Sequence, residues 1–141
     1  MENPTSTTVP QAVHLGNVLL QMRGFLMHQL DTAMQAHGIS IKLSQMKVML
    51  SLYSKTPVRA SDLARTICYD PGAMTRLLDG LNQQGLLTRT RDEADRRTVW
   101  LLLTPEGAAL KEKLKSIHIQ VMEAMLAPLT QADRDHLLHS L

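Results

Sequence analysis

The most informative stretch of the chain is DPGAMTRLLDGLNQQGLLTRTRDEADRRTVWLLL, residues 70–103. Asp70 has the side-chain oxygen that an N-cap needs, and Pro71 suits the first position of a helix. The apolar residues that follow recur at helical spacing through Leu81, and Gly85 is typical of a helix end. The stretch therefore predicts a helix that begins sharply, with the positive end of its dipole facing outward.

A basic hairpin is predicted directly after this helix. It runs over residues 87–91, turns through residues 92–95 and returns over residues 96–103. In the returning part, one face is formed by Val99, Leu101 and Leu103 and the other by Thr98, Trp100 and Leu102, so one face is expected to pack on helices. A helix followed by a basic hairpin is suited to reading DNA, because the helix fits a major groove and the hairpin can contact the backbone or the minor groove.

Arginine is the preferred cation in this part of the chain. Residues 56–104 contain seven Arg (Arg59, Arg65, Arg76, Arg89, Arg91, Arg96, Arg97) and no Lys, although six Lys occur elsewhere. Arg forms two parallel hydrogen bonds to a phosphate or a guanine edge and is favoured in narrow minor grooves. The alternative is an ordinary solvated surface, because six acidic residues in the same stretch leave its net charge near +1.

Five short motifs occur in order along the chain. They are Ser61-Asp62-Leu63-Ala64, the run from Met74 to Leu81, Gln84-Gly85-Leu86-Leu87, Asp95-Arg96-Arg97, and the run from Leu101 to Gly107. In this order and spacing they resemble the signature of the MarR family of bacterial winged-helix regulators, from about Leu15 to Leu141. The resemblance implies a mainly α fold with a small β-hairpin wing, a winged helix-turn-helix with N- and C-terminal dimerisation helices.

The resemblance also implies a DNA-binding site. Its expected residues are Gly72, Ala73, Thr75 and Arg76 on the helix and Arg91, Asp95, Arg96 and Arg97 on the hairpin. By analogy with the family, Arg96 probes the minor groove while Asp95 braces the loop by pairing with a neighbouring Arg. Where the family often has Ser-Thr, this chain has Gly72-Ala73, so its sequence preference is expected to depend more on Arg76, thymine methyl contacts and DNA shape.

Composition favours a single helical domain or two small lobes that share long helices. The 141 residues are 44% hydrophobic but only 3% aromatic, with nine Met, and the net charge is +2. One cysteine excludes an internal disulfide framework and fits a reducing cytoplasm. Because the sequence shows no apolar run of membrane-spanning length and no export signal, we expect a cytoplasmic protein without a membrane partner.

The chain is expected to divide into a polar tail, two dimerisation segments and one lobe. Residues 1–10 form the flexible tail, residues 11–38 and 105–141 the dimerisation helices, and residues 39–104 the DNA-binding lobe, in which Ser44 is expected to cap a helix. Thr104-Pro105 predicts the start of a helix, and Thr130 with Asp133 predicts a capping box. The expected dimer contacts are Leu15, Leu19, Leu114, Ile117, Val121, Leu137, Leu138 and Leu141; the alternative is that these apolar residues pack within one chain.

The resemblance also implies a site for a small-molecule effector. Family members commonly bind aromatic or phenolic acids, and the candidates here are Arg23, His28, Ser44, Met49 and Arg91. The sequence also offers candidates for two other sensing chemistries: a zinc site among six His, with His136 and His139 on one helix face, and a redox switch at Cys68, which precedes a helix N-terminus. Solvated His and a buried Cys are the preferred interpretations, so no metal and no cofactor are expected.

No enzyme motif is found. The sequence lacks a Walker loop, a dinucleotide fingerprint, HExxH and GxSxG, and shows no Cys/His nucleophile arrangement. We therefore expect a homodimeric repressor, not an enzyme, that binds a pseudo-palindromic double-stranded operator and is released by a small ligand. A metal- or redox-sensing regulator on the same fold and a helical protein–protein adaptor remain the alternatives.

Overall fold

The computed structural model describes residues 10–140, so the predicted tail (apart from Pro10) and Leu141 lie outside the described residues. Six helices and three short strands follow one another along the chain. In order they are α1 (Gln11–Ala36), α2 (Leu43–Ser51), β1 (Val58–Arg59), α3 (Ala60–Thr66), α4 (Pro71–Gln83), β2 (Leu87–Arg91), β3 (Val99–Leu103), α5 (Pro105–Leu126) and α6 (Gln131–Ser140). The mainly helical fold with a small antiparallel sheet confirms the predicted fold class.

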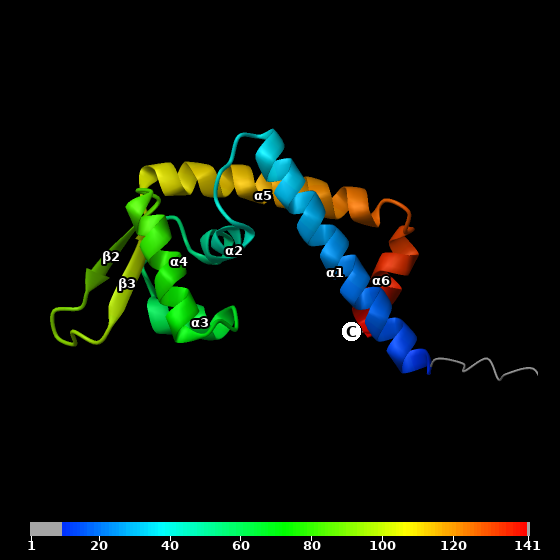
Figure 1. The fold of residues 1–141 in the computed structure, drawn as a ribbon, viewed down its shortest axis with the longest axis horizontal. Coiled ribbons are helices and arrows are strands. Elements are labelled where there is room, and N and C mark those ends of the chain that lie inside the picture. The colour runs from blue at the N-terminus through cyan, green and yellow to red at the C-terminus, as the bar shows by residue number, and fades with distance from the viewer. Residues whose placement is uncertain (1–9, 141) are drawn as a thin grey trace, which may run out of the picture.

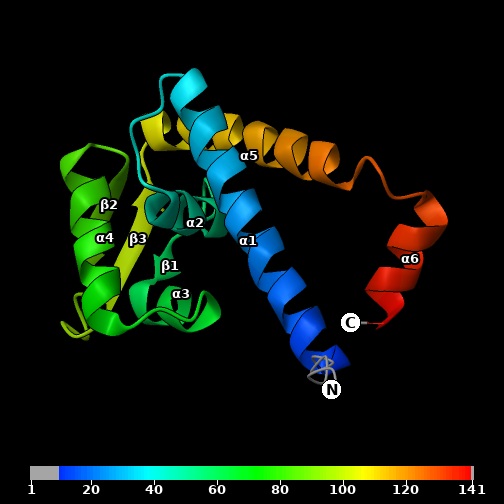
Figure 2. The ribbon, with the colours of Figure 1, turned by 45° about the vertical axis from the view of Figure 1, so that its right-hand side comes forward.

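Two parts of the molecule are visible in Figures 1 and 2. Helices α2, α3 and α4 and the three strands form one lobe, while α1, α5 and α6 extend away from it. Helix α1 packs on α5, and both contact α2. The 26 residues of α1 bury only Leu30 and Met34, both near its C-terminal end, so its first half projects beyond the core.

The wing contains one more strand than the sequence predicts. The sheet has the order β1-β3-β2, both pairs antiparallel, with Val58 opposite Leu101 and Leu87 opposite Leu103. Strand β1 has two residues, too few to give an alternating pattern. The returning strand begins at Val99, not at residue 96, so Arg96, Arg97 and Thr98 belong to the loop.

Local signals place most helix ends correctly. The backbone N–H of Ala73 donates to Asp70 Oδ2 (3.0 Å), and that of Gly107 donates to Thr104 Oγ1 (3.0 Å). Gly85, just beyond α4, has φ +70°, a conformation that glycine adopts without strain. The prediction for Ser44 is wrong: α2 starts after Lys42, whose N–H donates to Gln45 Oε1 (2.9 Å), so Ser44 lies inside the first turn.

The core lies inside the lobe and where α1 and α5 pack on α2. It is aliphatic and rich in Met, and its most enclosed side chains include Met34, Met49, Leu81 and Leu114. The prediction that Leu114 and Ile117 contact a second subunit is wrong, because these side chains are 0% and 3% exposed within the single chain. They are covered because α5 packs on α1 and α2 of the same chain.

Helix α6 is attached by polar contacts at its start. Thr130 and Asp133 form the predicted capping box, and the hydrogen bonds from Thr130 lower the pKa of the Asp133 carboxyl. Arg134 donates to Glu123 (3.0 Å) and to the carbonyl of Leu126 (2.9 Å), which fixes α6 to the end of α5. Among residues 10–140, no helix combines the length and apolarity needed to span a membrane.

Candidate nucleic-acid interface

Helices α3 and α4 are joined by a tight turn, the geometry of a helix-turn-helix. The N–H of Tyr69 donates to the carbonyl of Ala64 (3.0 Å), which closes the end of α3. Cys68 adopts φ 55° in this turn and its side chain is exposed. The expectation of a buried Cys68 is therefore wrong, because the left-handed turn directs this residue outward.

The two faces of α4 have different roles. Met74, Leu78 and Leu81 are buried and fix the helix to the lobe. On the opposite face, Gly72, Thr75 and Arg76 are exposed, while Ala73 is half-buried. The Thr75 hydroxyl donates to the carbonyl of Pro71 (3.0 Å), so its oxygen keeps acceptor capacity toward solvent. The exposed first turn has small side chains, which allows the helix end a close approach to another surface.

The wing loop, residues 92–98, is held by two carboxylates. Asp92 Oδ1 accepts from the N–H groups of Ala94 (2.9 Å) and Asp95 (3.0 Å). Asp95 in turn accepts from the Arg97 backbone N–H (3.0 Å) and the Thr98 hydroxyl (3.0 Å). The prediction for Asp95 needs correction: it braces the loop through a backbone amide and a hydroxyl rather than through a guanidinium.

Trp100 connects the wing loop to the sheet, a contact that the sequence analysis did not find. Its indole N–H donates to Asp92 Oδ2 (2.9 Å), and the Arg59 guanidinium lies 5.1 Å from its ring centre. Arg59 and Trp100 are also paired between β1 and β3. The Trp100 hydrogen bond, followed by those from Asp95 and Ala94, lowers the pKa of Asp92. We call Arg59, Asp92 and Trp100 the wing clasp.

The seven arginines divide into two groups. Arg59 stacks on Trp100, Arg65 lies 3.8 Å from Asp62, and Arg89 forms an ion pair with Asp79 that ties β2 to α4. The other four are exposed and form no salt bridge with any described residue: Arg76, Arg91, Arg96 and Arg97. These four are the arginines chosen from the sequence, and they are free to bind an anion.

The exposed arginines lie on two neighbouring projections. Both views of the ribbon place the start of α4 and the wing loop at the end of the lobe that is remote from α5 (Figures 1 and 2). The start of α4 and the wing loop therefore lie at the same end of the lobe. A positive helix end beside a basic loop is a surface suited to a nucleic-acid backbone.

A separate cavity of about 580 Å³ lies between α1, α2 and α5. Of the residues predicted to bind an effector, Arg23 and Ser44 line it, together with Lys47, Tyr69 and His118. The other three do not. Met49 is 0% exposed, His28 is an exposed residue of α1, and Arg91 lies on the wing. The Met49 prediction is wrong because helix periodicity does not tell a core side chain from one that lines a cavity.

Potential metal ligands do not gather in this structure. Within residues 10–140, no group of three or more His, Cys, Asp or Glu side chains is close enough to hold a metal ion. His136 and His139 are exposed on α6.

Comparison with known proteins agrees with the geometry. Residues 41–99 match the model of the MarR family. The chain is 35% identical over 79 residues to the organic hydroperoxide resistance transcriptional regulator of Bacillus subtilis, covering 56% of this chain and 54% of that protein. It is 31% identical over 94 residues to the HTH-type transcriptional regulator SarZ of Staphylococcus haemolyticus, covering 67% and 63%. The matched part thus spans 54% and 63% of the length of these two relatives.

Solved structures extend the similarity of the fold to most of the chain. A mutant MarR from E. coli, crystallised with operator DNA, superposes with a TM-score of 0.80 at 24% identity, covering 92% of this chain and 91% of that one. AbsC, a MarR family transcriptional regulator from Streptomyces coelicolor, gives a TM-score of 0.81 at 21% identity, covering 97% and 93%. With its winged helix-turn-helix and its wing motif, the chain is similar to the MarR family in residues 41–99 and shares the fold of solved MarR proteins over most of its length.

Proposed function

We propose that this protein is a transcriptional regulator that binds double-stranded DNA with sequence preference. The proposal rests on four exposed arginines that form no salt bridge within residues 10–140: Arg76 on α4, and Arg91, Arg96 and Arg97 on the wing. In this proposal α4 enters the major groove, Thr75 and Arg76 contact base edges or phosphates, and Arg96 reaches the adjacent minor groove. E. coli MarR, whose structure has a similar fold, was crystallised with operator DNA, which supports a DNA-binding role by analogy.

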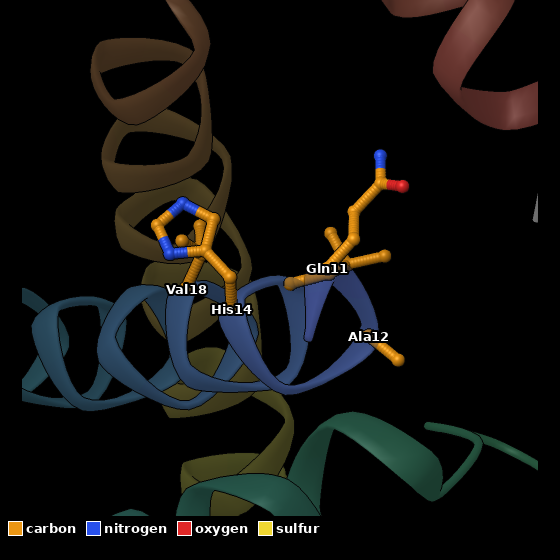
Figure 3. A pocket seen from close by; sticks show the side chains of 5 residues that line it. Gln11, Ala12, His14 and Val18 are labelled. Carbon is orange, nitrogen blue, oxygen red and sulfur yellow. The ribbon is translucent and has the colours of Figure 1, made fainter. Parts of the chain in front are cut away.

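The proposed regulator acts as a homodimer. Helix α1 carries six large apolar side chains that are exposed in the single chain: Val13, Leu15, Leu19, Leu20, Met22 and Phe25. Leu137 and Leu138 on α6 are exposed as well. The hollow shown in Figure 3 is formed only by residues from the start of α1, with His14 and Val18 on one side of the helix. An apolar surface of this extent favours a second copy that covers it.

The cavity between α1, α2 and α5 is the proposed effector site. It combines apolar side chains such as Met27 and Leu50 with the cations Arg23 and Lys47. His118 Nδ1 is buried at this cavity with no hydrogen-bond partner among the described residues, so a ligand with a polar group can satisfy it. Apolar walls with a few polar groups suit a small aromatic or phenolic acid.

In this proposal the dimer represses transcription while it is bound to the operator, and a ligand releases it from the DNA. A ligand seated beside α1, α2 and α5 favours a dimer in which the two α4 helices no longer match successive major grooves. A differential affinity of about 3 to 5 kcal/mol between the two dimer forms is enough to empty the operator. The related transcriptional regulators support this role over an enzymatic one.

Fluorescence anisotropy tests the proposal. A labelled duplex from upstream of the protein's own gene is compared with a scrambled duplex at two salt concentrations. The proposal predicts tight binding that weakens steeply with salt and prefers the upstream duplex. Equal and salt-independent binding of both duplexes would contradict the proposal and would favour a protein partner. If the upstream duplex is bound, benzoate and salicylate are added to the complex to test whether they release the DNA.

A further inference from the structure

A second hollow, of about 570 Å³, lies between the start of α2 and the exposed side of α4. It is separate from the wing and from the cavity between α1, α2 and α5, although Ser44 and Tyr69 reach both hollows. Its polar lining includes Ser40, Lys42, Gln45 and Arg76, and no carboxylate is among the residues that line it. The hollow therefore combines two cations from different elements with neutral polar groups.

The two cations are available for a ligand. Lys42 and Arg76 are exposed, and neither forms a salt bridge with any residue in the range 10–140. Lys42 precedes α2 directly, so its charge adds to the positive end of that helix. The N–H groups of Leu43 and Ser44, in the first turn, have no acceptor within the helix.

The side-chain amide of Gln45 indicates that a ligand in this hollow is an anion. Its side chain is only 6% exposed, yet it lines the hollow. Oε1 accepts from the Lys42 N–H, whereas the structure gives the Nε2 amide no acceptor among the described residues. Gly80 of α4 allows this amide to lie there, because a Cβ at Gly80 would stand 2.9 Å from Gln45 Nε2. The enclosed side chain thus offers the hollow a donor without a partner.

We propose that this hollow binds one phosphate group of the DNA backbone beside the major groove that α4 enters. The inference rests on the proposed DNA-binding function and deepens it by giving the protein an anchor on α2, outside the helix-turn-helix and the wing. Lys42 supplies the charge, Gln45 Nε2 and the first amides of α2 supply donors, and Arg76 adds positive potential from the α4 side. Such a contact positions α4 without reading sequence.

The salt dependence of DNA binding tests whether the Lys42 charge contacts a phosphate. Lys42→Gln is compared with Lys115→Gln, an exposed lysine on α5. Each subunit of the proposed dimer loses one phosphate contact, so the magnitude of the slope of log K against log salt is expected to fall by about 1.8 per dimer, for the operator and the scrambled duplex alike. Lys115→Gln is expected to keep the parent slope. A parent slope in Lys42→Gln would overturn the inference while leaving the proposed function intact; a parent protein that binds neither duplex would overturn both.

Gln45→Glu tests the direction of the hydrogen bond. Glu keeps an oxygen for the Lys42 N–H, and its charge is favourable at the third position of a helix, which offsets the cost of burying a carboxylate; the melting temperature is therefore expected to stay close to that of the parent. The variant replaces a donor amide by a carboxylate oxygen that repels phosphate. We expect DNA affinity to fall by about tenfold or more, the size of a lost charge-assisted contact. Parent affinity in the folded variant would contradict the proposed donor.

A modified duplex distinguishes a backbone phosphate from a free one. Single phosphates of the operator are replaced by neutral methylphosphonate, and each duplex is titrated with the parent and with Lys42→Gln. One position is expected to weaken the parent and leave Lys42→Gln unaffected. If no position behaves in this way, and the DNA-free parent instead binds inorganic phosphate in a Lys42-dependent manner by calorimetry, the hollow takes a free anion and the inference is wrong.

Discussion

At the scale of single residues, Arg76 and Arg96 place positive charge at two different points of the proposed interface. Arg76 lies on the exposed face of α4, next to Thr75, whereas Arg96 lies in the wing loop. Both are exposed and without a salt bridge to any residue that the structure describes. Their different positions predict different consequences of substitution.

Arg76→Ala is expected to cost about 1 to 3 kcal/mol of binding free energy and to relax sequence preference, because in the proposed orientation this side chain contacts base edges. Anisotropy titrations against the operator and single-base variants measure both effects. Lys113→Ala on α5 is the matched control. If the variant keeps the parent's preference among these duplexes, Arg76 does not read bases.

Arg96→Ala is expected to weaken binding to all sequences by a similar factor and to flatten the salt slope, because a wing contact to backbone or minor groove carries little sequence information. The same titrations at several salt concentrations give the slope. An unchanged slope and affinity would place the wing tip away from DNA.

At the scale of elements, the wing clasp fixes the wing loop against the sheet. Asp92 holds the loop amides with one oxygen and the Trp100 indole with the other, while Arg59 covers the Trp100 ring. The clasp joins residues from β1, the loop and β3, so its loss is expected to free the loop without unfolding the lobe. Asp92→Ala should lower DNA affinity several-fold while the far-UV circular dichroism stays that of the parent; unchanged affinity would show that the clasp does not position the wing.

The clasp also predicts a pH dependence. The hydrogen bonds lower the pKa of Asp92 from its ordinary value of 3.8. A carboxyl with a lowered folded-state pKa contributes stability above its ordinary value, and this contribution is lost as pH falls through the lowered pKa. Fluorescence of Trp100, the only Trp in the chain, should therefore change below pH 3.8. Asp92→Asn should remove this transition; its persistence in that variant would assign it to another group.

Gly107 sets the approach of α5 to the wing. A Cβ at this buried position would overlap the carbonyl oxygen of Leu86, so only glycine fits without displacement of the backbone. Gly107→Ala is expected to lower the free energy of unfolding by about 3 kcal/mol, the upper range for overpacking. Urea denaturation measures this. Gly16→Ala, with open space around its Cβ, is the control, and equal stability of the two variants would contradict the close approach.

Local rules explain which elements could be predicted from the sequence. Asp70-Pro71, Gly85 and Thr104-Pro105 act through their own backbone neighbours, and the structure confirms them. Strand β1 depends on pairing with β3, more than 40 residues away in sequence, and leaves no local pattern. The cap at Lys42 also escaped prediction, because its oxygen comes from Gln45 three residues later.

The site residues also divide into those that local sequence identifies and those that depend on contacts between separate elements. The four exposed arginines were identified by type and by their position on the helix or hairpin. The wing clasp and the unpartnered Gln45 amide depend on side chains from separate elements meeting in space. Likewise, periodicity identified Met49 and Leu114 as inward-facing but could not tell a cavity or a subunit interface from the core.

At the scale of the whole molecule, the exposed apolar residues of α1 and α6 predict a dimer. Leu19 is 53% and Leu138 75% exposed in the single chain. The double variant Leu19→Asp/Leu138→Asp is expected to sediment as a monomer with parent-like circular dichroism. Loss of two-site binding should lower operator affinity about a hundredfold or more.

A matched control separates interface loss from a general effect of charge. Tyr53→Asp changes an apolar residue of similar exposure outside these helices, between α2 and β1, and should sediment like the parent. Dimeric sedimentation of the double variant would exclude this surface as the subunit interface.

The central claim is that a dimer of this chain presents two α4 helices and two wings to one side of DNA. Hydroxyl-radical footprinting of the protein on its upstream duplex tests it most directly. The claim predicts two protected regions centred about one helical turn, about 10 bp, apart on one face, with weaker protection in the flanking minor grooves. A single protected region, or none at concentrations that saturate binding, would contradict it.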